Sequence, residues 1–174
     1  MNLQEEEGIV STRSFNLLVQ WMYIGRVIFD DLPPEEAITA TIEFARLADM
    51  CGIKGMEHSM AEHIKSVLLA GRPPSTKARR KKSDTSSRYF TPKHIISAVL
   101  LPNRHPVRTI LASAAVPGYL THDNYLSKAL EVPEFAVDLI REVQTAIRSF
   151  ESRGSGVSFQ DPLSDSRITL HFDG

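Results

Sequence analysis

Apolar residues recur at helical spacing in the stretch FNLLVQWMYIG, which covers residues 15 to 25. The repeated positions form two adjacent stripes, made up of Phe15, Leu17, Leu18, Trp21 and Met22. Hydroxyl side chains just before this stretch can cap a helix, and Gly25 can take the left-handed conformation that closes many helices. We therefore expect a helix with a broad buried face. The β-branched and aromatic residues at 27–29 then predict a short strand.

A helical hairpin is expected next. The stretch DDLPPEEAITATIEFARLADMCG begins with tandem prolines and acidic residues, which suit the first turn of a helix, and ends at Gly52. Cys51 lies on the apolar stripe of this helix, so we expect it to be a small core residue. In KGMEHSMAEHIKSVLLA the helical spacing continues at Met56, Met60, Ile64, Val67 and Leu68. Gly71 and the prolines after it end this second helix, which gives the hairpin.

Capping signals open a further helical block at residue 90. Thr91 can act as N-cap and Pro92 suits the first helical position, while Phe90 and Ile95 have the spacing of a hydrophobic staple. We expect this helix to run through about Leu101. The same block also contains weaker helix signals, which start at Pro106 and continue through Ala115, meet a turn at Pro117-Gly118, and resume after Asp123 with Tyr125, Leu126 and Leu130.

The clearest helix of the chain is predicted after Pro133. Large apolar residues form one continuous stripe there, made up of Phe135, Leu139, Val143, Ala146 and Phe150. Burial of each large member contributes roughly 1.5 to 3 kcal/mol of gross transfer free energy. We expect this helix to hold the second block together.

Charge divides the chain into segments. Residues 1–71 hold 5 Lys and Arg against 11 Asp and Glu, residues 72–88 hold 7 against 1, and residues 89–174 hold 8 against 9. The stretch GRPPSTKARRKKSDTSSR has almost no apolar content, so we expect residues 72–88 to be a flexible basic linker. The end of the chain, 151–174, has a similar composition apart from ITLHF, and we expect it to be mostly disordered.

These patterns predict a mainly α-helical protein. Residues 1–71 form a small α+β block of helix, short strand and helical hairpin, and residues 89–150 form a small helical block. The longest apolar runs stop well short of the roughly 18 residues that a bilayer span needs, and the amino terminus lacks a signal-peptide pattern. Cys51 is the only cysteine, so no internal disulfide can form. We therefore expect an intracellular protein, in the nucleus or cytoplasm, with no membrane partner.

Two segments carry a resemblance to a known family. FNLLVQWMYIGRV followed by IEFARLADMCGIKGME resembles the carboxy-terminal half of a BTB/POZ domain, in the version common in filamentous fungi. The matching positions are Trp21, Tyr23, Gly25, Leu47, Ala48, Asp49 and Met50. HPVRTILA and VPEFAVDLI are similar to the helical extension of fungal members, through Pro106, Arg108, Pro133, Glu134 and Phe135.

The resemblance implies a protein-interaction module that acts as a scaffold or adaptor, without catalysis, cofactor or small-molecule substrate. Its partner would be a protein, and another BTB chain is one such partner. The family's amino-terminal half, which forms most of its homodimer face, has no counterpart here, and neither has its cullin-contact motif. Either the chain is a truncated version of the domain or a partner chain completes the sheet, and the sequence leaves both open.

Candidate chemistry is sparse. His58 and His63 are five residues apart, which places them off a shared helical face, and no cysteine or carboxylate pattern completes a tetrahedral metal site. We therefore interpret both as surface histidines. No glycine-rich phosphate loop, nucleophile elbow or paired-carboxylate motif occurs either, so we expect no enzyme activity.

One basic run stands out in the linker. It consists of Lys77, Arg79, Arg80, Lys81 and Lys82. Such a run can solubilise a linker, serve as a nuclear-import signal, or contact phosphates without sequence preference. The alternative to the scaffold function is therefore a nuclear regulator that contacts nucleic acid through this run. We consider nucleic acid the less favoured partner, because a single basic cluster is common by chance.

Overall fold

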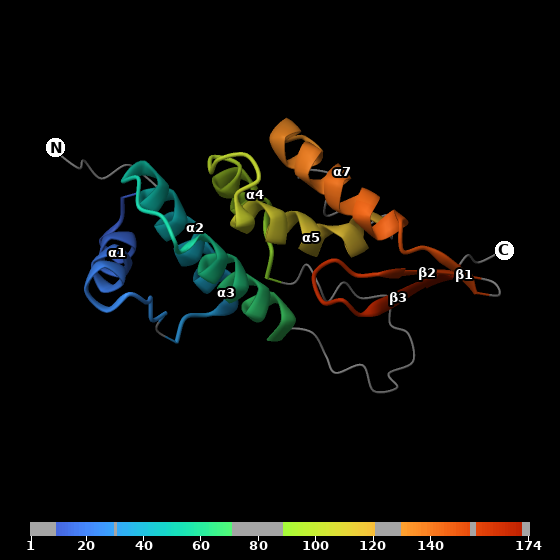
Figure 1. The fold of residues 1–174 in the computed structure, drawn as a ribbon, viewed down its shortest axis with the longest axis horizontal. Coiled ribbons are helices and arrows are strands. Elements are labelled where there is room, and N and C mark those ends of the chain that lie inside the picture. Colours follow the sequence, from blue (N-terminus) through green and yellow to red (C-terminus); the bar gives the residue numbers. More distant parts are fainter. Residues whose placement is uncertain (1–9, 30, 71–88, 121–129, 154–155, 172–174) are drawn as a thin grey trace.

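Helices make up most of the described chain, and a small sheet follows them (Figure 1). A computed structural model describes residues 10–29, 31–70, 89–120, 130–153 and 156–171. The helices are α1 (Thr12–Ile24), α2 (Pro34–Met50), α3 (Glu57–Ala70), α4 (Pro92–Ala98), α5 (Pro106–Leu120) and α7 (Pro133–Ile147). The strands are β1 (Glu151–Arg153), β2 (Gly156–Gln160) and β3 (Arg167–His171). The expectation of a mainly α-helical chain is confirmed.

The ends of α1 follow the predicted capping signals. The backbone N–H of Ser14 donates to Ser11 Oγ at 3.1 Å, and the backbone N–H of Ser11 donates to Ser14 Oγ at 3.0 Å. Gly25 adopts φ 65°, and its N–H donates to the carbonyl of Trp21 at 2.9 Å. Reciprocal bonds of this kind satisfy backbone donors that a helix start leaves unpaired, which is why α1 begins and ends where it does.

The strand predicted at 27–29 is wrong. These residues run without regular secondary structure, and among the described residues no strand lies beside them. The backbone N–H of Ile28 donates to Gln20 Oε1 at 3.0 Å, and the Phe29 ring stacks on His63. β-propensity reflects packing against a neighbouring strand, so without that neighbour the side chains fix the segment in another way.

The hairpin of α2 and α3 is confirmed, with one correction. Gly52 and Gly55 adopt φ 67° and 99° in the turn between the helices, a region that favours glycine. Cys51 is exposed, and not the core residue expected from the apolar stripe. The reason is that α2 ends at Met50, so Cys51 lies in the turn and its side chain leaves the helix face.

The helix α5 runs further than the sequence indicated. It continues through Leu120 with Pro117 inside, so the turn expected at Pro117-Gly118 does not form. A proline inside a helix removes a hydrogen bond and costs about 3 kcal/mol. All residues from 111 to 118 are buried, and this burial offsets the cost. Of the helix predicted after Asp123, Tyr125 and Leu126 lie outside the described residues, and Leu130 is described and helical.

The prediction of a mostly disordered end of the chain needs a larger correction. Within 151–174, expected to be mostly disordered, the described residues form a three-stranded antiparallel sheet in the order β1-β2-β3. Phe159 in β2 pairs with Ile168 in β3, and both Phe159 and Leu163 are fully buried. Composition misled the prediction because few apolar residues are needed here: Phe159 reaches the core from β2, and Leu163 reaches it from the connection between β2 and β3.

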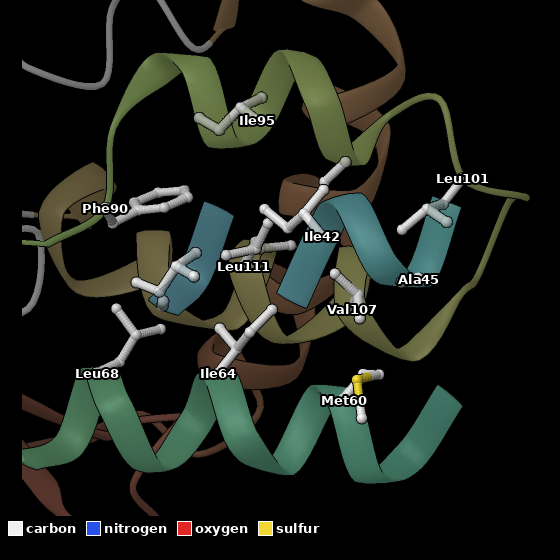
Figure 2. Packing of buried hydrophobic residues seen from close by; sticks show 14 of the residues in the cluster. Ile42, Ala45, Met60, Ile64, Leu68, Phe90, Ile95, Leu101, Val107 and Leu111 are labelled. Carbon is white, nitrogen blue, oxygen red and sulfur yellow. The ribbon is translucent and has the colours of Figure 1, made fainter. Parts of the chain in front are cut away.

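Both helical blocks contribute to one core (Figure 2). Met60, Ile64 and Leu68 of α3 point toward α2 and α5. Val107 and Leu111 of α5 meet them from the other block, and Phe90 and Ile95 close the same core from the α4 side. The α7 stripe is buried as predicted at Phe135, Leu139, Val143 and Ala146, whereas Phe150 is 39% exposed and lies beyond the helix end. The two blocks are therefore joined by a continuous interior.

Candidate functional site

The apolar surface of α1 is the most exposed apolar area near the family-motif residues. Only Ser14, Leu17 and Leu18 of this helix are buried, because α1 packs against α2 at one end of the molecule (Figure 1). The large apolar residues left exposed on α1 and the segment after it are Phe15, Met22, Tyr23, Ile24 and Ile28. We call this set the α1 surface. The expectation of a broad buried face on α1 is wrong at Phe15 and Met22, which are 45% and 68% exposed.

The four family-motif residues do not form a single site. Trp21 is half-buried against the core, and Gly25 caps α1 beside it. Tyr23 is 86% exposed and belongs to the α1 surface. Asp49 lies apart, exposed near the end of α2. Trp21 and Gly25 therefore shape the end of α1, whereas Tyr23 faces solvent. Asp49 lies on another helix.

An open hollow lies between the end of α1 and α3. Its volume is about 450 Å³. The lining residues are Trp21, Gly25, Arg26, Val27, Phe29, Ser59, Met60, Glu62, His63 and Ser66. Trp21 and the segment that follows Gly25 thus place the α1 surface next to a cavity with an aromatic wall.

His63 is the most distinctive residue of this hollow. Its ring stacks on Phe29 with centroids 3.9 Å apart and planes 12° apart. Its Nε2 atom is buried, and no described residue forms a hydrogen bond with it. Burial lowers the pKa of His63 below the ordinary 6.5, so the ring is neutral at pH 7. The interpretation as a surface histidine is therefore wrong for His63. Its stacking partner Phe29 lies 34 positions earlier in the sequence, so no local signal indicated the stack.

The arrangement offers no metal site. His58 is exposed and His63 is stacked on Phe29, so the two do not converge. Among the described residues, no group of three or more His, Cys, Asp or Glu side chains could hold a metal ion.

A second, smaller cavity of about 140 Å³ lies at the turn between α2 and α3. Asp49, Lys54, Glu57 and His105 supply its polar lining. His105 Nδ1 accepts a hydrogen bond from the Val107 N–H at 3.2 Å, and burial lowers the pKa of His105 although Glu57 and Asp49 raise it. This cavity has room for a few water molecules, and its charges are of both signs.

Arg108 forms a buried cluster of hydrogen bonds with residues from α7 and from the segment after α4. The buried guanidinium donates from Nε to Asp138 Oδ2 at 2.8 Å, and a further nitrogen lies 2.7 Å from the same oxygen. It also donates to the carbonyls of Leu101 and Glu134 at 3.0 and 3.2 Å. We call these residues the Arg108 cluster. It ties the end of α4 to the start of α7, which is a structural role that sequence patterns could not assign.

The basic run at 77–82 lies outside the described residues. Among those that are described, no helix has the length and apolar character that a membrane span requires. No family model matches the sequence, and no curated protein or solved structure is significantly similar to it.

Proposed function

We propose that this protein is a protein–protein interaction module of the BTB/POZ type that acts as a scaffold or adaptor and performs no catalysis. The α1 surface is the observation that carries this proposal. It comprises five exposed large apolar side chains on one helix and the segment after it, at the end of a well-packed core. Large exposed apolar areas on a protein surface mark interaction sites.

The composition of the α1 surface suits an interface. Tyr23 and Met22 belong to the residue types that are enriched in the buried centre of protein interfaces. Burial of a large apolar side chain contributes roughly 1.5 to 3 kcal/mol, so a few such residues supply a useful gross free energy of association. The neighbouring hollow adds an aromatic wall, formed by Trp21, Phe29 and His63, beside the α1 surface.

The resemblance suggests which partner to test. Helix, glycine cap and helical hairpin follow one another in α1, α2 and α3 in the order that the family segment has. In that family the domains pair with one another or with other proteins. A full-length BTB-domain protein is therefore the proposed partner of the α1 surface.

The test is direct binding to a full-length BTB-domain protein, measured by light scattering after size-exclusion chromatography. The wild-type chain is expected to form a complex, and the double variant Met22→Glu, Ile28→Glu is expected to lose it while its thermal unfolding stays unchanged. Ile96→Glu, at an exposed position of α4, is the matched control and keeps binding. A wild-type chain that forms no complex at about 100 µM contradicts the proposal, and so does a complex that the double variant still forms.

The alternative is a regulator that contacts nucleic acid through Lys77, Arg79, Arg80, Lys81 and Lys82. It depends on the sequence of the basic run alone. Its test is the salt dependence of binding, which is steep for a protein that neutralises several phosphates.

A further inference from the structure

The helix α7 has a second apolar stripe, on the face turned away from the core. Val137, Ile140 and Ile147 are 53%, 53% and 50% exposed, whereas the inner stripe of the same helix is buried. A helix that packs on one side of a globular core normally carries polar residues on the other side. The fold of one chain therefore gives no reason for these three aliphatic side chains.

The spacing of this stripe is that of a coiled coil. Val137, Ile140, Gln144 and Ile147 follow one another at intervals of three, four and three residues, which is the pattern of the a and d positions of a heptad. Gln144 is exposed and takes one a position. A polar residue at such a position costs stability but fixes the register between two helices.

The charged residues beside the stripe suit pairing with a copy of the same helix. Glu134, Arg141 and Arg148 lie on one flank, seven residues apart, at the e positions of the heptad. When two copies of α7 run antiparallel with Arg141 at the centre, Glu134 of each copy lies opposite Arg148 of the other. Arg141 is already held by Asp138 of its own helix at 3.2 Å, which moderates the repulsion at the centre.

A parallel arrangement of the two helices leaves these charges without partners. In a parallel pair, the flank with Glu134, Arg141 and Arg148 would face the opposite flank, which carries the small or apolar residues Ala136 and Val143. An antiparallel pair also brings the amino-terminal end of one helix beside the carboxy-terminal end of the other, so the helix dipoles attract. Both effects favour the antiparallel copy.

We propose that the outer face of α7 is a homodimer interface, in which two copies of α7 pack antiparallel through Val137, Ile140 and Ile147 and Glu134 pairs with Arg148 across the two-fold axis. Val137 then packs against Ile147 of the other copy, and Ile140 lies near Gln144. This interface does not depend on the α1 surface, which lies on a different helix at the far end of the molecule (Figure 1).

Charge exchange in the full chain tests the pairing, with the dimer fraction measured by sedimentation velocity over a concentration series. Glu134→Arg and Arg148→Glu are each expected to raise the dimer dissociation constant about tenfold or more, because each places like charges opposite one another. The double variant Glu134→Arg, Arg148→Glu is expected to dimerise as the wild type does. An equimolar mixture of the two single variants is expected to form a heterodimer. In both facing pairs of this heterodimer, position 134 of one chain and position 148 of the other carry charges of opposite sign.

Apolar variants and a control complete the experiment. Ile140→Ser is expected to abolish the dimer, while Ile24→Ser on the α1 surface leaves it unchanged. A far-ultraviolet circular dichroism spectrum equal to that of the wild type shows for both variants that the fold is kept. A wild-type chain that is monomeric at about 200 µM overturns the proposal. So does a dimer that survives Ile140→Ser, or single charge variants whose mixture remains monomeric, since another surface or another orientation would then be responsible.

Discussion

At the scale of single residues, Arg108 is the one arginine that is buried among the described residues. Its side chain is 7% exposed and that of its partner Asp138 is 4% exposed. Removing charges from water is costly, and an ion pair offsets that cost only when its remaining donors are also bonded. Backbone carbonyls of Leu101 and Glu134 take further guanidinium donors, so the Arg108 cluster meets this condition.

Breaking the Arg108–Asp138 pair should lower the stability of the fold strongly. Asp138→Ala leaves the guanidinium buried without its carboxylate, and we expect the free energy of unfolding to fall by about 3 to 5 kcal/mol in urea titrations. Thr145→Ala is the control, because Thr145 is exposed on the same helix and its hydroxyl bonds only the Arg141 carbonyl, and its effect should stay within about 0.5 kcal/mol. A loss below about 1 kcal/mol for Asp138→Ala would show that the pair is not buried as described.

His94 joins two helices through a defined tautomer. Its Nδ1 accepts the Thr91 N–H at 3.1 Å, so the proton lies on Nε2, which donates to Thr39 Oγ1 at 2.9 Å. Thr39 in turn donates to the carbonyl of Glu35 at 3.0 Å. Burial lowers the pKa of His94 from 6.5, although the Glu35 carboxylate raises it. Protonation at Nδ1 would break the bond to Thr91.

Stability should therefore fall in mildly acidic solution. Because the folded pKa of His94 lies below the unfolded value of 6.5, the unfolded chain binds more protons as the pH drops under 6.5, and the free energy of unfolding decreases. His63 and His105 have pKa values lowered in the same direction. Urea titrations at about pH 7.5 and about pH 5 measure the change, and His94→Gln should make it smaller. A stability that rises toward pH 5 contradicts this account.

At the scale of elements, local signals predicted helices well and strands poorly. Ser11 and Gly25 bound α1 through contacts with residues three or four positions away, so the sequence alone contained the information. The segment at 27–29 and the strand β2 have similar apolar residues, yet only β2 pairs, because pairing depends on partners such as Ile168 that lie elsewhere in the chain. Pro117 stays helical for the same reason, since tertiary burial overrides the local preference.

The candidate site was predictable only in part. Trp21 and Gly25 stood out through the family resemblance, and both line the hollow beside α1. The stack of His63 on Phe29 joins residues 34 positions apart in sequence, and no periodicity reports such a contact. The exposure of Phe15 and Met22 could not be predicted either. An apolar stripe has the same sequence pattern whether or not a neighbouring element covers it.

The sheet should contribute strongly to stability. Phe159 of β2 is fully buried, and its ring centroid lies 5.7 Å from that of Phe150. Phe159→Ala is expected to lower the free energy of unfolding by about 3 to 5 kcal/mol, because it opens a cavity in the core. Thr169→Ala, at an exposed position of β3, serves as the control. Denaturant titration measures the free energy of unfolding of both variants. If both substitutions lower it by the same small amount, the sheet does not pack on the helices.

At the scale of the whole molecule, one interior connects residues on both sides of the basic run. Met60 and Ile64 of α3 pack with Val107 and Leu111 of α5, although the positively charged segment separates them in sequence. Closing a loop of this length costs a few kcal/mol at most, since loop entropy grows only slowly with length. Burial of the shared apolar side chains can readily offset that cost.

The basic run should be dispensable for protein binding. Replacing Lys77, Arg79, Arg80, Lys81 and Lys82 by glutamine is expected to leave complex formation with a BTB-domain protein unchanged, because that binding is assigned to the α1 surface. Titration calorimetry at two salt concentrations measures the affinity of the wild-type chain and of this variant for the BTB-domain protein. Loss of binding in the variant, together with a steep dependence on salt, would favour the alternative in which this run is the working element.

The shared core of α2, α3 and α5 supports both proposed surfaces, and native-state hydrogen exchange of the full chain tests it most directly. If the core is one cooperative unit, the slowest amides of α3, around Ile64, and of α5, around Leu111, exchange with the same free energy and the same dependence on low denaturant. Two distinct free energies, with α3 opening while α5 stays protected, would contradict a single core.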